Sequence, residues 1–197
     1  LIRSGKKVIP EIMVPLTCDV SEFKHSKTII ERVHAEILRR FDLPELPYKL
    51  GTMIEIPRAA LLADKMAASA EFFSFGTNDL TQYLHAVDRM NPAITAYYQS
   101  MSPSMLRILG RIFADFNKAG KPISVCGELA GDHLGALVMF GLGLRKFSMN
   151  AANISRVKRT LSLFTLEETE DIAKKVQGLS TEAEVISYIK GEVDKRG

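Results

Sequence analysis

The sequence predicts an α/β fold in which parallel strands are joined by helical crossovers. Short apolar runs of strand length recur along the chain, and the segments between them carry helix caps or apolar residues at helical spacing. Five such strands alternate with helices, and further helices follow the last strand. This order fits either a doubly wound sheet or part of a (β/α)8 barrel, and periodicity alone does not separate the two.

Five apolar segments have the length of buried strands and are bounded by polar residues, glycine or proline. They are residues 8–16, 49–56, 71–75, 122–126 and 146–149. Parallel strands need a connection of about a dozen residues or more, usually a helix. Each gap between these segments is long enough for one.

The intervening segments predict the crossover helices. Ser21 is expected to cap the first helix, because apolar residues at helical spacing follow it. Pro57 opens the second helix, where its missing N–H costs nothing. Ser102 caps a later helix that Gly120 ends. The expected crossover helices are residues 21–38, 57–70, 79–87, 103–119, 134–142 and 154–164. Two capping boxes, Thr165-x-x-Glu168 and Thr181-x-x-Glu184, predict two more helices, and their charged residues are expected to form solvated faces.

The composition is that of an ordinary globular domain. The 197 residues are 46% hydrophobic and 25% charged, with a formal net charge of +3. This balance does not favour a nucleic-acid partner, and no apolar run approaches the ~20 residues of a membrane span. The two cysteines, Cys18 and Cys126, are far apart and fit neither a disulfide framework nor a zinc pattern. We therefore expect a reducing compartment, the cytoplasm.

Two carboxylates are expected at neighbouring strand ends, where ligands bind in parallel α/β folds. Glu55 lies in the apolar run MIEIP, where an unpaired charge is costly, and Asp79 follows the third strand. Mg²⁺ takes one or two protein carboxylates and completes its octahedron with water and substrate oxygens. The pair is therefore a candidate Mg²⁺ site. The alternative is a salt bridge between Glu55 and Arg58 or a lysine.

Two further residues near strand ends can carry chemistry. Cys126 ends the fourth strand, where a thiol can act as a nucleophile or proton donor, although a free cysteine is more often a small buried hydrophobe. Arg89 can clamp a phosphate or carboxylate with two hydrogen bonds. Its alternative is a surface pair with Asp88. Asn78, next to Asp79, follows the third strand.

Five motifs together resemble the phosphoenolpyruvate (PEP)-binding barrel of the PEP-utilising enzymes: MIEIPRAAL, FFSFGTNDLTQY, AVDR, MSPSM and CGELAGD. This family includes enzyme I of the sugar phosphotransferase system, its nitrogen-related paralogue, pyruvate phosphate dikinase and PEP synthase. PEIMVPL and GTMIEIPRAAL look more like the dikinase. The longer set of AVDR, YYQSMSPSM, CGELAGD, FSMN and RVKRTL looks more like the PEP-protein phosphotransferases, which are enzyme I and its paralogue.

The resemblance implies a role for each candidate residue. Glu55 and Asp79 would hold Mg²⁺, and Asn78 and Arg89 would bind the phosphoryl group. Cys126 would give a proton to C3 of the enolate. It also implies that residues 1–164 are the C-terminal five of eight strands of a TIM barrel, with 165–197 as helices packed on it. The first three strands, with further arginines and a lysine, would precede Leu1.

The implied activity is transfer of the phosphoryl group of PEP to a histidine on another domain of a longer chain, leaving pyruvate. A phosphocarrier protein is the expected acceptor if the chain is enzyme I, and a homodimer is expected. The isolated chain is expected to be inactive. Three alternatives stay open: a fragment of the dikinase or PEP synthase, a non-catalytic assembly module, and an unrelated α/β enzyme with a carboxylate metal site.

Overall fold

A parallel sheet of four strands forms the centre of the structure, a computed structural model that describes residues 4–196. Its strands are β1 (Glu11–Val14), β2 (Lys49–Ile54), β3 (Phe72–Gly76) and β4 (Ile123–Cys126). Each strand pairs with its successor, in the order β1-β2-β3-β4. A doubly wound sheet reverses its order at a switch point, whereas a barrel does not. The predicted α/β fold is confirmed, and the strand order is that of a barrel segment with an open sheet.

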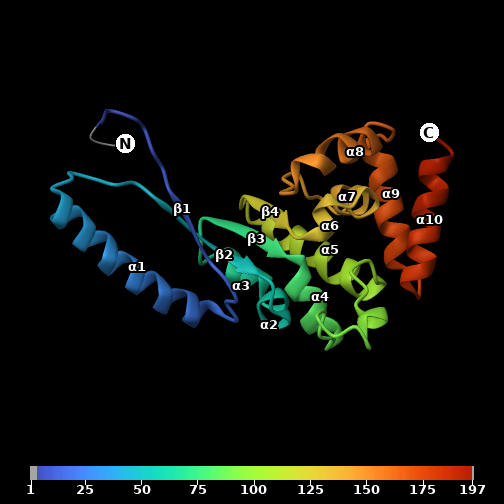
Figure 1. The fold of residues 1–197 in the computed structure, drawn as a ribbon, viewed down its shortest axis with the longest axis horizontal. Helices are drawn as coiled ribbons and strands as arrows, with labels where there is room; N and C mark the ends of the chain where they lie inside the picture. Colours follow the sequence, from blue (N-terminus) through green and yellow to red (C-terminus); the bar gives the residue numbers. More distant parts are fainter. Residues whose placement is uncertain (1–3, 197) are drawn as a thin grey trace.

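Helices fill the connections and the C-terminal third of the chain (Figure 1). Before β4 they are α1 (Val20–Phe41), α2 (Pro57–Leu61), α3 (Ala63–Ala67), α4 (Thr77–His85), the 3-10 turn η2 (Thr95–Tyr97) and α5 (Pro103–Lys118). After β4 they are α6 (Glu128–Gly131), α7 (His133–Gly141), α8 (Ala151–Leu161), α9 (Leu166–Gln177) and α10 (Glu182–Asp194). In Figure 1 α1 lies at one end of the molecule, and α8, α9 and α10 gather at the other.

Three expected elements are shorter than the sequence suggested. The first strand, expected over residues 8–16, is confined to Glu11–Val14. The fifth strand, residues 146–149, is reduced to one parallel bridge between Phe147 and Val125. Within residues 4–196 it has β4 on one side and no strand on the other, so it does not form a ladder. The Ala-rich helix expected over 57–70 divides into α2 and α3 at Leu62, whose backbone φ of −103° departs from helical geometry.

The caps explain where the helices begin, and one prediction was wrong. Asp19, not Ser21, is the N-cap of α1, because its Oδ1 accepts the backbone N–H groups of Ser21 and Glu22. The Ser21 hydroxyl also donates to that carboxylate, at 2.6 Å. The predicted caps Ser102, Thr165 and Thr181 are confirmed, and both threonines form complete capping boxes.

Aromatic side chains join the sheet to α5 in the core. The Phe116 ring of α5 lies 4.3 Å from the Phe73 ring and 5.6 Å from the Phe75 ring, centroid to centroid, and Phe113 lies 5.0 Å from Phe75. All four are almost fully buried. Such pairs add ~0.5–1.5 kcal/mol to the burial of each ring. The packing holds β3 against α5, and so helps to fix the end of β3 that leads into Asp79.

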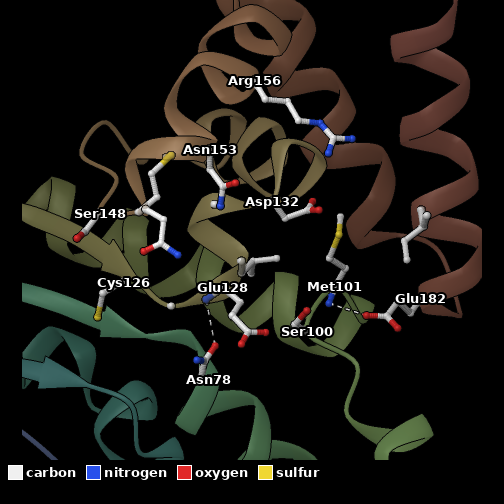
Figure 2. A pocket seen from close by; sticks show the side chains of 16 residues that line it. Asn78, Ser100, Met101, Cys126, Glu128, Asp132, Ser148, Asn153, Arg156 and Glu182 are labelled. Carbon is white, nitrogen blue, oxygen red and sulfur yellow. Dashed lines mark hydrogen bonds between the residues drawn. The ribbon is translucent and has the colours of Figure 1, made fainter.

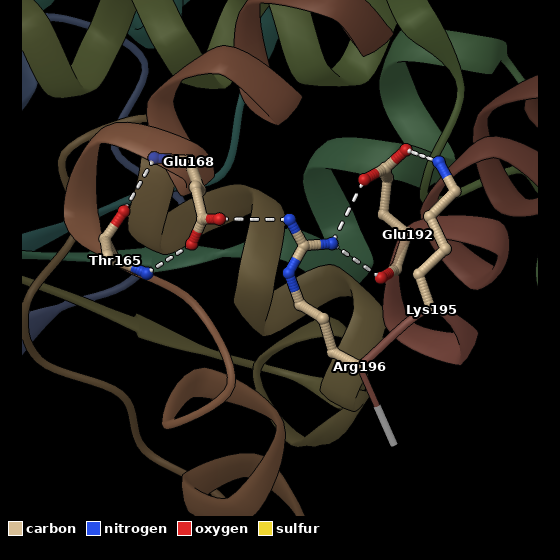
Figure 3. Close-up of polar contacts among 5 residues, drawn as sticks. All are labelled: Thr165, Glu168, Glu192, Lys195 and Arg196. Atoms are coloured by element: carbon tan, nitrogen blue, oxygen red, sulfur yellow. Dashed lines mark hydrogen bonds and ion pairs between the residues drawn. The ribbon is translucent and has the colours of Figure 1, made fainter.

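The C-terminal helices belong to the same apolar core as the sheet. Ile172 and Val176 of α9 and Val185 and Ile189 of α10 are buried in it. The polar faces of these two helices were expected to be solvated. They also carry ion pairs, in which Arg196 joins α9 to α10 (Figure 3). Its guanidinium lies 3.0 Å from Glu168 and 3.1 Å from Glu192. The division at residue 165 remains a prediction.

The β1 end of the molecule exposes apolar surface. Ile12 and Met13 point to opposite faces of β1, and they are 39% and 37% exposed. On α1 only Phe23 is fully buried, while Ile29 and Val33 are exposed. In the part of the chain that the structure describes, every helix is too short or too polar to span a lipid bilayer.

Candidate active site at the carboxyl edge of the sheet

The two predicted carboxylates lie together at the carboxyl edge. Glu55 follows β2 and Asp79 lies in the first turn of α4, directly after β3. Gly76 makes the approach possible, because a Cβ at this position would overlap the Glu55 carboxylate. Glu55 is 3% exposed, and its Oε1 accepts the Leu16 backbone N–H at 2.7 Å.

The carboxylates of Glu55 and Asp79 carry more negative charge than the one nearby arginine, Arg89, can neutralise. Burial, with Asp79 as a further cause, raises the pKa of Glu55, and the Leu16 N–H and Arg89 oppose the rise. Arg58 pairs with Asp19 at 2.8 Å, so the proposed Glu55–Arg58 salt bridge is wrong. Arg89 lies 3.5 Å from Asp79, and not in the predicted surface pair with Asp88. The arginine therefore balances one of two adjacent carboxylates.

This donor set fits a hard cation such as Mg²⁺. Among residues 4–196, no group of three or more His, Cys, Asp or Glu side chains is placed to hold a metal ion. Two carboxylates are nevertheless the protein share that Mg²⁺ commonly takes, with water and substrate oxygens as the remaining ligands. A cation beside Glu55 and Asp79 would also offset the desolvation that raises the pKa of Glu55.

Asn78 links the ends of β3 and β4. Its Oδ1 accepts the backbone N–H of Glu128 at 3.2 Å, and its carbonyl accepts the Tyr98 hydroxyl at 3.1 Å. Gly127 lies between them with a φ of +117°, a conformation that disfavours other residues. A Cβ there would lie 2.5 Å from Thr77 Oγ1. Gly127 therefore permits the close contact between the two strand ends.

Cys126 is a half-buried free thiol opposite Gly76 in the sheet. The Ser74 hydroxyl donates to its Sγ at 3.5 Å, and the thiol donates to the Phe75 carbonyl at 3.6 Å. The sulfur is therefore held in place, and it also borders open space. For Cys126, a role in chemistry rather than packing remains a prediction made from the sequence.

A cavity of about 840 Å³ opens beside Cys126 and Asn78 (Figure 2). One wall comes from these strand ends and Glu128, and the opposite wall from α8 and α10, which supply Arg156 and Glu182. Glu55, Asp79 and Arg89 are not among its lining residues. Asn78 therefore stands between the carboxylate pair and the cavity.

Several residues of this region were not predicted from the sequence. Glu182 was expected on a solvated helix face, yet its Oε1 accepts the Met101 backbone N–H at 2.8 Å. Tyr98 lies inside a quoted motif, but nothing in the pattern marked its hydroxyl as a contact of Asn78. Arg156 lines the cavity from α8; it lies in the motif RVKRTL, but nothing in that motif marked it as a residue of the cavity.

The sheet and its edge define an α/β protein wound like a barrel, with carboxylates, an amide, an arginine and a thiol gathered at the carboxyl ends of its strands. The family described as PEP-utilising enzyme, PEP-binding domain, matches residues 1–165. The chain belongs to this family, which confirms the resemblance inferred from the motifs.

Curated relatives agree with the family match. The phosphoenolpyruvate-protein phosphotransferase of Bacillus subtilis (strain 168) is 36% identical over 190 residues, which are 96% of this chain and 33% of that protein. The protein of the same name from Borreliella burgdorferi is 38% identical over 181 residues, 90% of this chain and 31% of that protein. The chain thus spans about a third of the length of these relatives. A solved structure, RipC from Yersinia pestis, is 16% identical with a TM-score of 0.46. The match covers 82% of this chain and 67% of that one.

Proposed function

We propose that this chain is the PEP-binding part of a PEP-protein phosphotransferase, which moves the phosphoryl group of PEP to a histidine on another domain of a longer chain. The observation that carries the proposal is the adjacent pair Glu55 and Asp79, with Arg89 3.5 Å from the aspartate and Asn78 beside it. The names of the relatives support the same activity. They favour it over a fragment of the dikinase or PEP synthase.

Each site residue takes one task in this proposal. Glu55 and Asp79 would hold Mg²⁺, and the ion would supply positive charge to offset the charge of PEP. Arg89 and Asn78 bind the phosphoryl group and orient it for transfer. The P–O bond to the enol oxygen breaks as the bond to the histidine nitrogen forms, and the electron pair stays on the enolate. The Cys126 thiol then gives its proton to C3, pyruvate leaves, and the thiolate regains a proton from water.

Metal binding tests the carboxylate pair. We expect Mn²⁺ or Mg²⁺ to bind the wild-type chain, and Glu55→Gln and Asp79→Asn each to lose at least about tenfold in affinity, equivalent to ~1.4 kcal/mol. Glu36→Gln, an exposed residue on α1, is the matched control and should bind normally. Equal affinity in all four proteins contradicts the proposed site.

The proton donor is tested with pyruvate and deuterated water. We expect exchange of the pyruvate methyl hydrogens to depend on Cys126, so Cys126→Ala removes it while Cys18→Ala keeps it. Both cysteines are free and partly buried, which makes Cys18 a suitable control. Exchange at the wild-type rate in Cys126→Ala would exclude the thiol as the proton donor.

The exposed end of the molecule suggests what the longer protein adds. Three further strands of the barrel would cover β1 and α1, and would bring the arginines and lysine that grip PEP. On this proposal the isolated chain does not turn over PEP, and pyruvate formation at a rate near that of a full enzyme would refute it. The phosphocarrier acceptor and the cytoplasmic location belong to the same proposal.

An assembly role is the second candidate, because an unpaired strand edge invites association. β1 has a pairing partner on one side alone among the described residues, and both of its faces are exposed. We expect the isolated chain to form dimers or larger species in sedimentation experiments. A stable monomer at high concentration would count against this candidate.

A further inference from the structure

The segment between α4 and α5, residues 86–102, carries Arg89 but has little regular structure of its own. It holds only the short turn η2. Arg89 reaches Asp79 through an ion pair of 3.5 Å between partly exposed side chains. Such pairs contribute at most ~1 kcal/mol and do not by themselves fix a long side chain. Other contacts must hold the segment over the site.

Several hydrogen bonds tie this segment back to α4, among them Val87 N–H to the Gln82 carbonyl at 3.0 Å and the contact between His85 Nε2 and Ser102 Oγ at 2.9 Å. Two more come from Arg89 and Tyr98. The Arg89 backbone N–H donates to Gln82 Oε1 at 3.2 Å. The Tyr98 hydroxyl donates to the Asn78 carbonyl at 3.1 Å. The Tyr98 bond ends in the first turn of α4, which also carries Asp79, so it joins the far end of the segment to the proposed phosphoryl-binding residues.

The surroundings of Tyr98 keep its hydroxyl a donor. Burial raises the pKa of Tyr98, and the nearby Arg89 guanidinium opposes that rise. The neighbouring Tyr97 is 66% exposed, and in the described part of the chain its hydroxyl has no hydrogen-bond partner.

We propose that Tyr98 is a positioning residue: its hydroxyl fixes segment 86–102 on the Asn78 carbonyl and so aligns the Arg89 guanidinium with Asn78 and Asp79. This inference rests on the proposed function, in which Arg89 binds the phosphoryl group of PEP. Tyr98 itself does not touch the reacting atoms. It acts through the arginine.

The first experiment needs no ligand. Phenylglyoxal modifies exposed arginines, and mass spectrometry gives the rate at Arg89, with the exposed Arg32 of α1 as an internal reference. Tyr98→Phe removes only the hydroxyl, and we expect Arg89 to react about fivefold faster, the equivalent of one hydrogen bond of ~1 kcal/mol. Tyr97→Phe should leave the rate unchanged. Equal rates in Tyr98→Phe and the wild type overturn the proposal.

The second experiment separates positioning from a general structural role. In the longer protein, which supplies the remaining residues that grip PEP, we expect Tyr98→Phe to weaken binding of PEP with Mg²⁺ about fivefold, and to have no further effect in an Arg89→Ala background. A merely structural role predicts the same loss in both backgrounds and a lower Tm, and that result overturns the proposal. If PEP with Mg²⁺ does not protect Arg89 from phenylglyoxal in the wild type, the proposed function fails. The ligand-free rates still decide the role of Tyr98.

Discussion

Replacing Glu55 by glutamine is expected to stabilise the metal-free chain while removing its metal affinity. The native state holds this carboxylate 3% exposed and next to Asp79, and these surroundings raise its pKa. A raised pKa of an acid means that its charged form is disfavoured by folding, so at pH 7 the folded state bears a cost. Glutamine has the same shape and keeps an oxygen to accept the Leu16 N–H.

The size of the effect follows from the charges nearby. Two like charges about 4 Å apart repel by ~4 kcal/mol at an effective dielectric constant of ~20. Asp79 is partly exposed and lies 3.5 Å from the Arg89 guanidinium, so solvent and the arginine cancel much of this repulsion. We expect Glu55→Gln to raise the free energy of unfolding by about 1–2 kcal/mol. The new amide hydrogens also face Asp79 and can donate to it.

Urea unfolding at pH 7, with a chelator and then with Mg²⁺, measures both sides of the effect. With Mg²⁺ at ten times its Kd, the free energy of unfolding of the wild type should rise by about 1.4 kcal/mol, and that of Glu55→Gln should not change. The variant should then no longer be more stable than the wild type. Glu36→Gln should follow the wild type in both conditions. A Glu55→Gln chain that is less stable than the wild type without metal would refute the reasoning.

Three further variants test the electrostatics, the backbone and the core. The Thr165 N–H holds the pKa of Glu168 below its usual value of 4.5. The stability that this carboxylate contributes is therefore complete above about pH 4.5 and declines as the pH falls. Glu168→Gln should lower the urea midpoint most at pH 7, and by less and less as the pH falls below about 4.5. Gly127→Ala should lower the free energy of unfolding by about 1–3 kcal/mol in thermal unfolding, because Gly127 has a φ of +117°. Gly120→Ala, whose added Cβ meets open space, should lower it by less. Phe116→Ala, which removes a buried ring from two aromatic contacts, should cost about 3–5 kcal/mol in urea unfolding.

The strand ends were predictable because two local patterns agree. Apolar runs of four to nine residues predict the strands, and in a parallel sheet all their carboxyl ends meet at one edge. Glu55 and Cys126 lie at the ends of such runs and Asp79 shortly after another, and the structure places all three at that edge. The fifth strand was overestimated because a strand depends on its neighbours as well as its composition, and Phe147 forms one bridge.

Contacts between distant segments could not be predicted. Arg89 is next to Asp88 in sequence, yet it faces Asp79 because the segment after α4 folds back on that helix. Glu182 reaches Met101 across 81 residues, a contact that depends on how α10 packs against the rest. Ser21 and Asp19 are both good caps, and the choice between them depends on the backbone geometry at the start of α1.

The bond between Glu182 and Met101 has a practical consequence for cutting the protein. The family match ends at residue 165, and a truncation there would look harmless on sequence grounds. It would remove Glu182 and Ile186, which form part of one wall of the cavity beside Cys126. It would also leave the Met101 N–H without its acceptor and expose the core that α9 and α10 cover. The smallest unit that keeps this cavity whole therefore extends at least through α10.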